Sequence, residues 1–128
     1  MKVLVTGCRK WNDVETVLKE LQQFPSGTIV IHGGCKGADI TAGVIAEELG
    51  FTVRSYLAEW DRYAFGAGPI RNQQMIDEEH RHEEPINLCL AFHDSISTSK
   101  GTADMVTRAR RALITCRVVS SSNKKDNK

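Results

Sequence analysis

Residues 28–39 read TIVIHGGCKGAD, and this stretch decides the fold. Its first half is a mostly β-branched run without polar alternation, which is typical of a strand covered on both faces of a parallel sheet. Two glycines end the run, and a helical pattern follows from about Ala38 to Leu49, with Gly50 expected as the residue that terminates the helix. A strand, a glycine turn and a helix together form the repeating unit of α/β proteins.

The same unit recurs on both sides of this stretch. Runs of β-forming residues predict further strands at residues 2–6, 52–57, 86–92 and 115–119, besides the one at 28–32. Helical patterns predict other helices over residues 14–24, from about Pro69, and over residues 102–113. Right-handed crossovers and short connections favour a doubly wound sheet. The sequence therefore predicts an α/β, Rossmann-like three-layer sandwich with a mainly parallel five-stranded sheet in the order 3-2-1-4-5.

Apolar spacing predicts which helix faces point inward. Asn12 and Glu15 offer a capping box at the start of the first helix, and apolar residues then recur at helical spacing. The residues expected to face inward are Val14, Val17, Leu18, Leu21 and Phe24 in the first helix and Ile40, Val44, Ile45 and Leu49 in the second.

Charge and length exclude several classes of protein. The 128 residues carry a net charge of +1, and Lys124, Lys125 and Lys128 outnumber Asp126 at the end of the chain, so residues 1–119 have a net charge of −1. This balance argues against a nucleic-acid partner. No apolar run approaches the roughly 18 residues that a membrane span needs. We expect one Rossmann-like domain over residues 1–119 and a polar, disordered tail over residues 120–128.

The cysteines indicate a reducing compartment. The chain enters a strand-like run at Lys2 without a signal-peptide pattern, which predicts a cytoplasmic protein with free thiols. Cys89 and Cys116 lie in apolar runs and are expected in the core, whereas Cys8 and Cys35 follow two strands and are expected near each other. No Cys-x-x-Cys or paired Cys/His spacing occurs, so we predict no metal and no cofactor.

A ligand site is expected where parallel strands end, at the crevice where their order reverses. Four segments converge there, at residues 7–11, 33–39, 60–72 and 93–104. In the second of them, glycines precede a helix whose free N–H groups attract anions. This segment matches neither a Walker A loop nor the dinucleotide pattern G-x-G-x-x-G. We predict phosphate contact there, with Gly33, Gly34, Lys36, Gly37 and Asp39 as the binding residues.

A second anion site is expected before the last helix. Lys100, Gly101 and Thr102 precede it, and Thr102 is either its N-cap or, with Arg9 nearby, part of an anion site. Trp60 and Arg62 either plug the end of the sheet or stack on a base.

The first turn of the third helix carries a cation that its dipole disfavours. Arg71 is followed there by Asn72, and a cation in that position suggests an anionic partner. This partner is either a ligand phosphate or an aspartate to which Arg71 is clamped. His32 is more typical of a core histidine than of a catalytic base.

Taken together, these segments resemble a known family. The matching residues are Gly7, Arg9 and Trp11, then 32–34 with 37–39, then Trp60, Arg62 and Tyr63, then 67–72, and finally 101–106. They are similar to the YspA-type branch of the SLOG superfamily, whose Rossmann-like domains are related to YpsA, to DprA and to the LOG phosphoribohydrolases. The resemblance spans nearly all of the chain before the tail and implies a nucleotide-like ligand, either sensed or processed, and a homodimer or higher homo-oligomer.

The match to the LOG enzymes is incomplete. Those enzymes cleave the N-glycosidic bond of nucleoside monophosphates with an Arg-Lys pair and a P-G-G-x-G-T-x-x-E motif. Arg71 matches the arginine, Asn72 replaces the lysine, and Met105 stands where the glutamate belongs. Asp104 is turned by about 100° from that position on a helix, which makes it a poor direct substitute.

The sequence therefore favours binding of a phosphorylated nucleotide or nucleotide-derived ligand at the carboxyl edge of the sheet. The alternative is a phosphoribohydrolase-like enzyme, with Arg71, Asp104 and Asp39 as catalytic candidates and Asp94 as a further carboxylate. The sequence leaves open whether the protein is an enzyme. A nucleic-acid binder similar to DprA is disfavoured by the negative charge of residues 1–119.

Overall fold

The computed structural model describes residues 1–122, except for the side chain of Phe65. Its sheet contains β1 (Lys2–Gly7), β2 (Ile29–His32), β3 (Thr52–Ser55), β4 (Leu88–Phe92) and β5 (Cys116–Val119). All neighbouring strands pair in parallel, in the order β3-β2-β1-β4-β5. The predicted α/β class, parallel sheet and strand order are confirmed.

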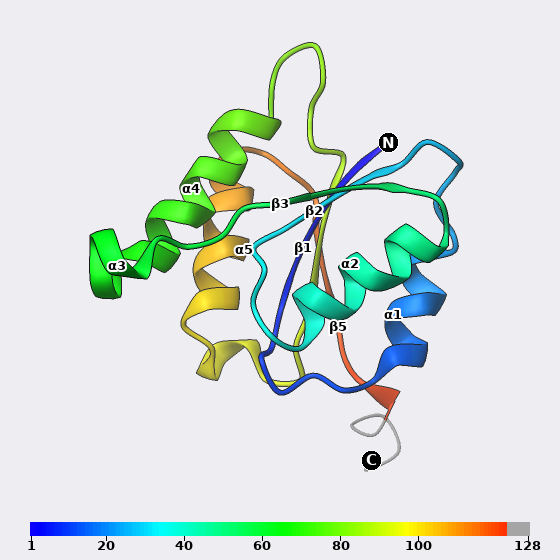
Figure 1. Cartoon of the computed structure of the whole chain (residues 1–128), viewed down its shortest axis with the longest axis horizontal. Helices are drawn as coiled ribbons and strands as arrows, with labels where there is room; N and C mark the ends of the chain where they lie inside the picture. The colour runs from blue at the N-terminus through cyan, green and yellow to red at the C-terminus, as the bar shows by residue number, and fades with distance from the viewer. Residues whose placement is uncertain (123–128) are drawn as a thin grey trace.

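Helices cover both faces of this sheet (Figure 1). The helices α1 (Val14–Leu21) and α2 (Ala38–Glu48) lie on one side, and α4 (Ala67–Glu79) and α5 (Gly101–Arg111) lie on the other. Between β3 and α4 the chain adds a short helix, α3 (Trp60–Tyr63), and the 3₁₀ turn η1 (Ala64–Gly66), while η2 (Ile96–Thr98) precedes α5. Successive residues of β1 divide between two cores, with Val3 and Val5 facing α1 and α2, and Leu4 facing α4 and α5. This alternation explains why the three successive residues at the centre of the strand are all apolar.

The predicted inner face of α2 is wrong. Ile40, Val44 and Leu49 are 46%, 52% and 37% exposed, and of the four residues expected inward only Ile45 is buried. The small residues Ala38, Ala42, Gly43 and Ala46 face the sheet instead. A Cβ atom on Gly43 would lie 2.7 Å from Nε2 of His32, so the helix packs too closely on β2 to accommodate large side chains there. The prediction was wrong because it used hydrophobicity alone, whereas the close packing of α2 on β2 requires small side chains on the inner face of the helix.

The start of α1 also differs from the prediction. Asp13, not Asn12, is the N-cap, and its carboxylate accepts hydrogen bonds from the backbone N–H of Thr16 at 3.2 Å and from the Thr16 hydroxyl at 2.6 Å. Val17 and Leu21 are buried as expected, but Val14 and Leu18 are more than one-third exposed. The helix begins one residue later than the predicted capping box requires.

The chain beyond β5 stays at the carboxyl edge of the sheet, where β5 ends. The hydroxyl of Ser121 donates to Asp94 at 2.7 Å, and the hydroxyl of Ser122 donates to Asp13 at 2.8 Å. The rest of the predicted tail, residues 123–128, lies outside the described residues. Within residues 1–122, no helix has the length and apolar character needed to cross a bilayer.

Candidate functional site

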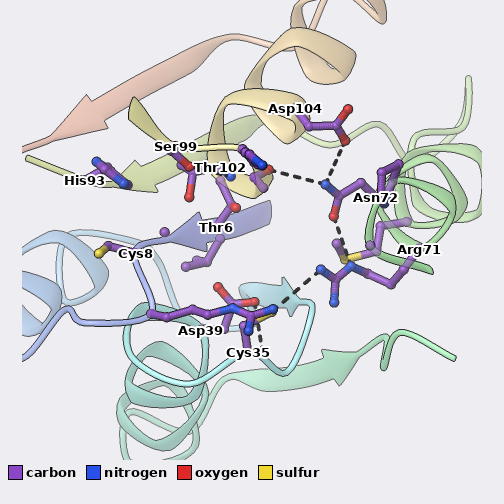
Figure 2. Close-up of a pocket in the computed structure, with 18 of the residues that line it drawn as sticks. Thr6, Cys8, Cys35, Asp39, Arg71, Asn72, His93, Ser99, Thr102 and Asp104 are labelled. Carbon is purple, nitrogen blue, oxygen red and sulfur yellow. Dashed lines mark hydrogen bonds between the residues drawn. The ribbon is translucent and has the colours of Figure 1, made fainter. Parts of the chain in front are cut away.

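A cavity of about 550 Å³ lies at the carboxyl edge of the sheet, within the usual range of roughly 300–1,000 Å³ for ligand pockets. Its walls come from the end of β1, the loop after β2, helices α3 and α4, the loop after β4 and the start of α5. Figure 2 shows side chains from these elements converging on one space. The site thus occupies the position at which the strand order reverses.

The structure brings together many, but not all, of the predicted site residues. Those that line the cavity are Gly7, Arg9, Asp39, Trp60, Arg71, Asn72, Lys100, Gly101, Thr102 and Asp104. Seven others do not line it: Trp11, Gly33, Gly34, Lys36, Gly37, Arg62 and Asp94. Trp11 is buried against Phe92, and the guanidinium of Arg62 lies over the ring of Tyr63.

Two of the predicted glycines join the loops that follow β1 and β2. A Cβ atom on Gly7 would lie 2.5 Å from the Cβ of Ala38. Gly37 has a φ of +81°, and a Cβ atom there would lie 2.3 Å from the carbonyl oxygen of Cys8. Only glycine allows this conformation and this close approach. Gly7 and Gly37 therefore allow the chain segments after β1 and β2 to pack closely beside the site.

Two of the amides at the start of α2 have hydrogen-bond partners within the protein. The N–H of Ala38 donates to the carbonyl of Cys8, and that of Ile40 donates to the carbonyl of Cys35. Oδ2 of Asp39 accepts from the N–H groups of Gly33 at 3.0 Å and Cys35 at 3.4 Å. The glycine turn after β2 thus encloses an internal carboxylate at the place where the sequence predicted a phosphate.

The start of α5 is more open. Thr102 was a candidate N-cap, but its own N–H donates to Oγ of Ser99 at 3.0 Å, and Lys100 is the N-cap. Within residues 1–122, the N–H groups of Gly101 and Ala103 have no hydrogen-bond partner. Lys100 and Gly101 line the cavity, so this helix start offers free donors and a cation to a ligand.

Arg71 is a buried clamp that also faces the cavity. Its guanidinium donates to the carbonyls of Gly33 and Tyr56, its Nε donates to Asn72 at 2.9 Å, and its Nη2 lies 3.7 Å from Sγ of Cys35. Among residues 1–122, no carboxylate lies within ion-pair distance of it. The aspartate clamp considered from the sequence is therefore absent from this part of the chain, and carbonyl oxygens hold the arginine. Its positive charge has no ion-pair partner there.

Asn72 connects α4 to α5 through a carboxylate. Its Nδ2 donates to Oδ2 of Asp104 at 2.9 Å, and Nε of Arg108 donates to the same oxygen at 2.8 Å. Asp104 lines the cavity, whereas Met105, which takes the place of the family's glutamate, is fully buried in the core. The helix thus turns residue 104, and not residue 105, toward the site.

Burial perturbs two titratable groups beside the glycine turn. Burial raises the pKa of Asp39 to about 6, although its amide hydrogen bonds and the cations Arg71 and Arg9 oppose this shift. For His32, burial and then Arg71 lower the pKa, and its Nδ1 accepts from the N–H of Gly34. His32 is thus a neutral buried residue, as the sequence suggested. Asp39 can exchange a proton near neutral pH.

Several cavity residues were not named among the predicted binding residues, although six of them lie in the four predicted segments. They are Val5, Thr6, Cys8, Cys35, Gly68, Pro69, Met75, His93 and Ser99. Thr6 and His93 lie at the carboxyl ends of central strands, a position that by itself marks a ligand edge. Cys8 and Cys35 line the same cavity, as expected for two loops after adjacent strands. In residues 1–122, no group of three or more His, Cys, Asp or Glu side chains is arranged to hold a metal ion.

Comparison with known proteins agrees with this architecture. The model of the YspA, cpYpsA-related SLOG family matches residues 1–63. The chain is also 34% identical over 122 residues to the Gene 61 protein of Mycobacterium phage D29, an alignment that covers 88% of this chain and 91% of that protein. The family match contains the glycine turn and the first half of the site, and the phage protein extends the similarity across nearly the whole chain. The protein belongs to the YspA, cpYpsA-related SLOG family.

Proposed function

We propose that this cavity binds a phosphorylated nucleotide or nucleotide-derived small molecule. One observation carries the proposal. Arg71, which has no ion-pair partner in the described residues, and the open start of α5 face the same cavity. A buried cation without an ion pair and free helix N–H groups both favour an anion. SLOG family membership is consistent with a nucleotide-related ligand.

The phosphate is expected at α5 and not at the glycine turn. At α5 the N–H groups of Gly101 and Ala103 are free, and Lys100 adds a charge. At the glycine turn Asp39 already accepts from the N–H groups of Gly33 and Cys35, and an ionised carboxylate repels a phosphate. Trp60 is half exposed and lines the cavity, so its ring is the candidate surface for a base.

A lysine pair provides a matched test. We expect Lys100→Ala to weaken binding of a nucleoside monophosphate by about tenfold, which corresponds to about 1.4 kcal/mol. Lys36→Ala removes the same charge from an exposed lysine outside the cavity and should change the affinity by less than about twofold. Native mass spectrometry of the purified protein identifies a retained ligand, and titration calorimetry with a panel of nucleoside phosphates gives the affinities. Equal losses in the two variants would contradict the proposed phosphate position.

An enzyme of the phosphoribohydrolase type is the second candidate function. The observation that favours it is the carboxylate of Asp104, which lines the cavity and is oriented by Asn72. A fixed carboxylate of this kind can stabilise an oxocarbenium-like transition state. Incubation with nucleoside monophosphates, followed by detection of free base and ribose 5-phosphate, separates the two candidates. Release of both products would establish turnover, whereas binding without release would leave the protein a binding domain.

The proposal includes a homo-oligomer and no nucleic-acid partner. The oligomer rests on the family resemblance, and the expected absence of nucleic acid rests on the negative charge of residues 1–119. Sedimentation equilibrium gives the oligomeric state. A gel-shift titration with single-stranded DNA at low salt tests the second statement.

A further inference from the structure

Cys89 and Cys116 form a pair of thiols outside the cavity, between two adjacent strands. They are register partners in β4 and β5, and β5 is the edge of the sheet. Register partners on parallel strands project from the same face of the sheet. Neighbouring strands lie about 4.8 Å apart, and a disulfide needs Cα atoms about 4.4–6.8 Å apart. The backbone therefore already satisfies the first requirement for a bond between these residues.

The two thiols pack in the same core cluster but differ in access. Cys89 is fully buried in the core between the sheet and α4 and α5, whereas Cys116 is half-buried at its margin. The thiol of Cys116 donates to the carbonyl oxygen of Ile114 at 3.5 Å. A reagent in solution can therefore reach Cys116 first, and Cys89 is positioned to react only with Cys116.

The surroundings of Cys116 favour its thiolate. The neighbouring thiol of Cys89 lowers the pKa of Cys116 to about 7, against the effect of burial, and the positive charge of Arg110 acts in the same direction. The neighbouring Cys116 in turn raises the pKa of Cys89, so Cys89 keeps its proton. The thiolate is the nucleophilic form of cysteine. At neutral pH, the accessible member of the pair is thus the reactive one.

We propose that Cys89 and Cys116 are a peroxide-reactive dithiol that closes to a disulfide between β4 and β5. In the first step, the sulfur of Cys116 attacks one oxygen of hydrogen peroxide. An S–O bond forms, the O–O bond breaks, and the leaving hydroxide takes up a proton to become water. Cys116 is thereby oxidised to a sulfenic acid and the peroxide is reduced.

In the second step, the sulfur of Cys89 attacks the sulfur of this sulfenic acid. The S–S bond forms, the S–O bond breaks, and the departing hydroxide takes the proton of Cys89 to give a second water. Two thiols and one peroxide thus yield one disulfide and two waters. An excess of a small thiol reverses the reaction by disulfide exchange.

The experiment uses the full-length protein in which Cys8 and Cys35 are replaced by serine, so that only the proposed pair remains. After treatment with hydrogen peroxide, we expect intact-mass spectrometry to show the loss of two hydrogen atoms, reversed by dithiothreitol. Peptide mapping should find the link between residues 89 and 116. A product that instead gains oxygen atoms on either cysteine without a link, or remains unchanged, would overturn the proposal.

A second variant tests the order of the two steps, and it places alanine, not serine, at the buried position 89. In the same background, Cys89→Ala removes the resolving thiol, and Cys116 should then accumulate as a sulfenic acid that dimedone traps. In the parent variant, dimedone labelling should be at least about tenfold lower because Cys89 closes the disulfide first. Equal labelling of the two proteins would show that Cys89 does not resolve the intermediate. The wild-type protein under the same treatment shows whether the link also forms with all four cysteines present.

Discussion

Two buried carboxylates, Glu79 at the end of α4 and Asp39 at the start of α2, are supported in opposite ways. Glu79 is 3% exposed, and it accepts from Nη1 of Arg54 at 2.6 Å and from the hydroxyl of Tyr56 at 2.6 Å, with Nζ of Lys2 at 3.3 Å. Asp39 is 4% exposed but has only two backbone N–H donors and no ion pair in the described residues. The two carboxylates are thus about equally buried, but cations and a hydroxyl group stabilise the charge of Glu79, whereas only backbone N–H groups donate to Asp39.

The pKa values follow this difference. For Glu79 burial raises the pKa, but the hydrogen bonds from Tyr56, Arg54 and Lys2 outweigh it, and the pKa is lower than usual. For Asp39 burial dominates, and the pKa rises to about 6. A fully compensated carboxylate stabilises the fold. An undercompensated one beside a cavity can change its charge when a ligand binds or when the pH changes.

The largest effect is expected from removing the charge of Glu79. Glu79→Gln keeps the volume but leaves Lys2, itself 5% exposed, without its buried counter-ion. Breaking a buried ion pair in this way costs about 3–5 kcal/mol, and urea unfolding at pH 7 measures the loss. Glu84→Gln is the control, because Glu84 is exposed and lies 3.9 Å from the same ammonium, so its loss should cost no more than about 1 kcal/mol. Similar losses for the two variants would remove the distinction between Glu79 and Asp39.

Asp39→Asn should act in the opposite direction and depend on pH. A carboxylate whose pKa is raised by folding favours the folded state only while protonated, so its contribution declines as the pH rises from about 4 to about 6. The difference from the ordinary aspartate pKa of 3.8 corresponds to about 3 kcal/mol. We therefore expect the free energy of unfolding of Asp39→Asn, relative to the wild type, to rise by up to about 3 kcal/mol between pH 4 and pH 7.

The control for Asp39 is an exposed acid. Asp61→Asn changes the same chemical group on the surface of α3 and should alter the free energy of unfolding by no more than about 0.5 kcal/mol. Measuring differences between variants also cancels the contributions of Glu79 and Asp13, whose pKa values are lowered and whose stabilisation is lost as the pH falls. A pH-independent difference for Asp39→Asn would mean that its carboxyl is compensated after all.

The sequence predicted the frame of the molecule because the frame depends on local patterns. Apolar strand runs and the alternation of strands and helices led to the sheet order, and the glycine turns led to the edge at which the cavity lies. It did not predict that Asp39 fills the glycine turn or that Ser99, and not Thr102, supplies the hydroxyl at the start of α5. Such partners are chosen by distances of a few ångströms between segments, which composition and spacing do not specify.

The cluster of Glu79 with Lys2, Arg54 and Tyr56, here called the Glu79 cluster, was still harder to predict from the sequence. Its members lie on β1, at the end of β3 and at the end of α4, up to 77 residues apart along the chain. In the sequence, Glu79 is one of several acidic residues around residue 80 that are typical of a solvated helix end. Only the pairing of β1, β2 and β3 brings Lys2 and Arg54 under the same helix. Long-range compensation of this kind distinguishes a structural charge from a surface charge, and a single sequence does not contain it.

The smallest effect is expected from removing one of the hydrogen-bond donors to the carboxylate of Glu79. Tyr56→Phe deletes the hydroxyl that donates to Oε2 of Glu79 at 2.6 Å and leaves the ring in place. A hydrogen bond to a charged group contributes about 1.5–3 kcal/mol, and the two remaining cations keep the loss near the lower end, at about 1.5 kcal/mol at pH 7. Because this hydroxyl is among the groups that lower the pKa of Glu79, that pKa should rise in the variant, and acid unfolding should begin at a higher pH than in the wild type.

The control is Tyr63→Phe, which alters a tyrosine outside the Glu79 cluster and should leave the pH of acid unfolding unchanged. If Tyr56→Phe lost stability equally at all pH values, the hydroxyl would matter only for packing, and the low pKa of Glu79 would have to come from Arg54 and Lys2 alone.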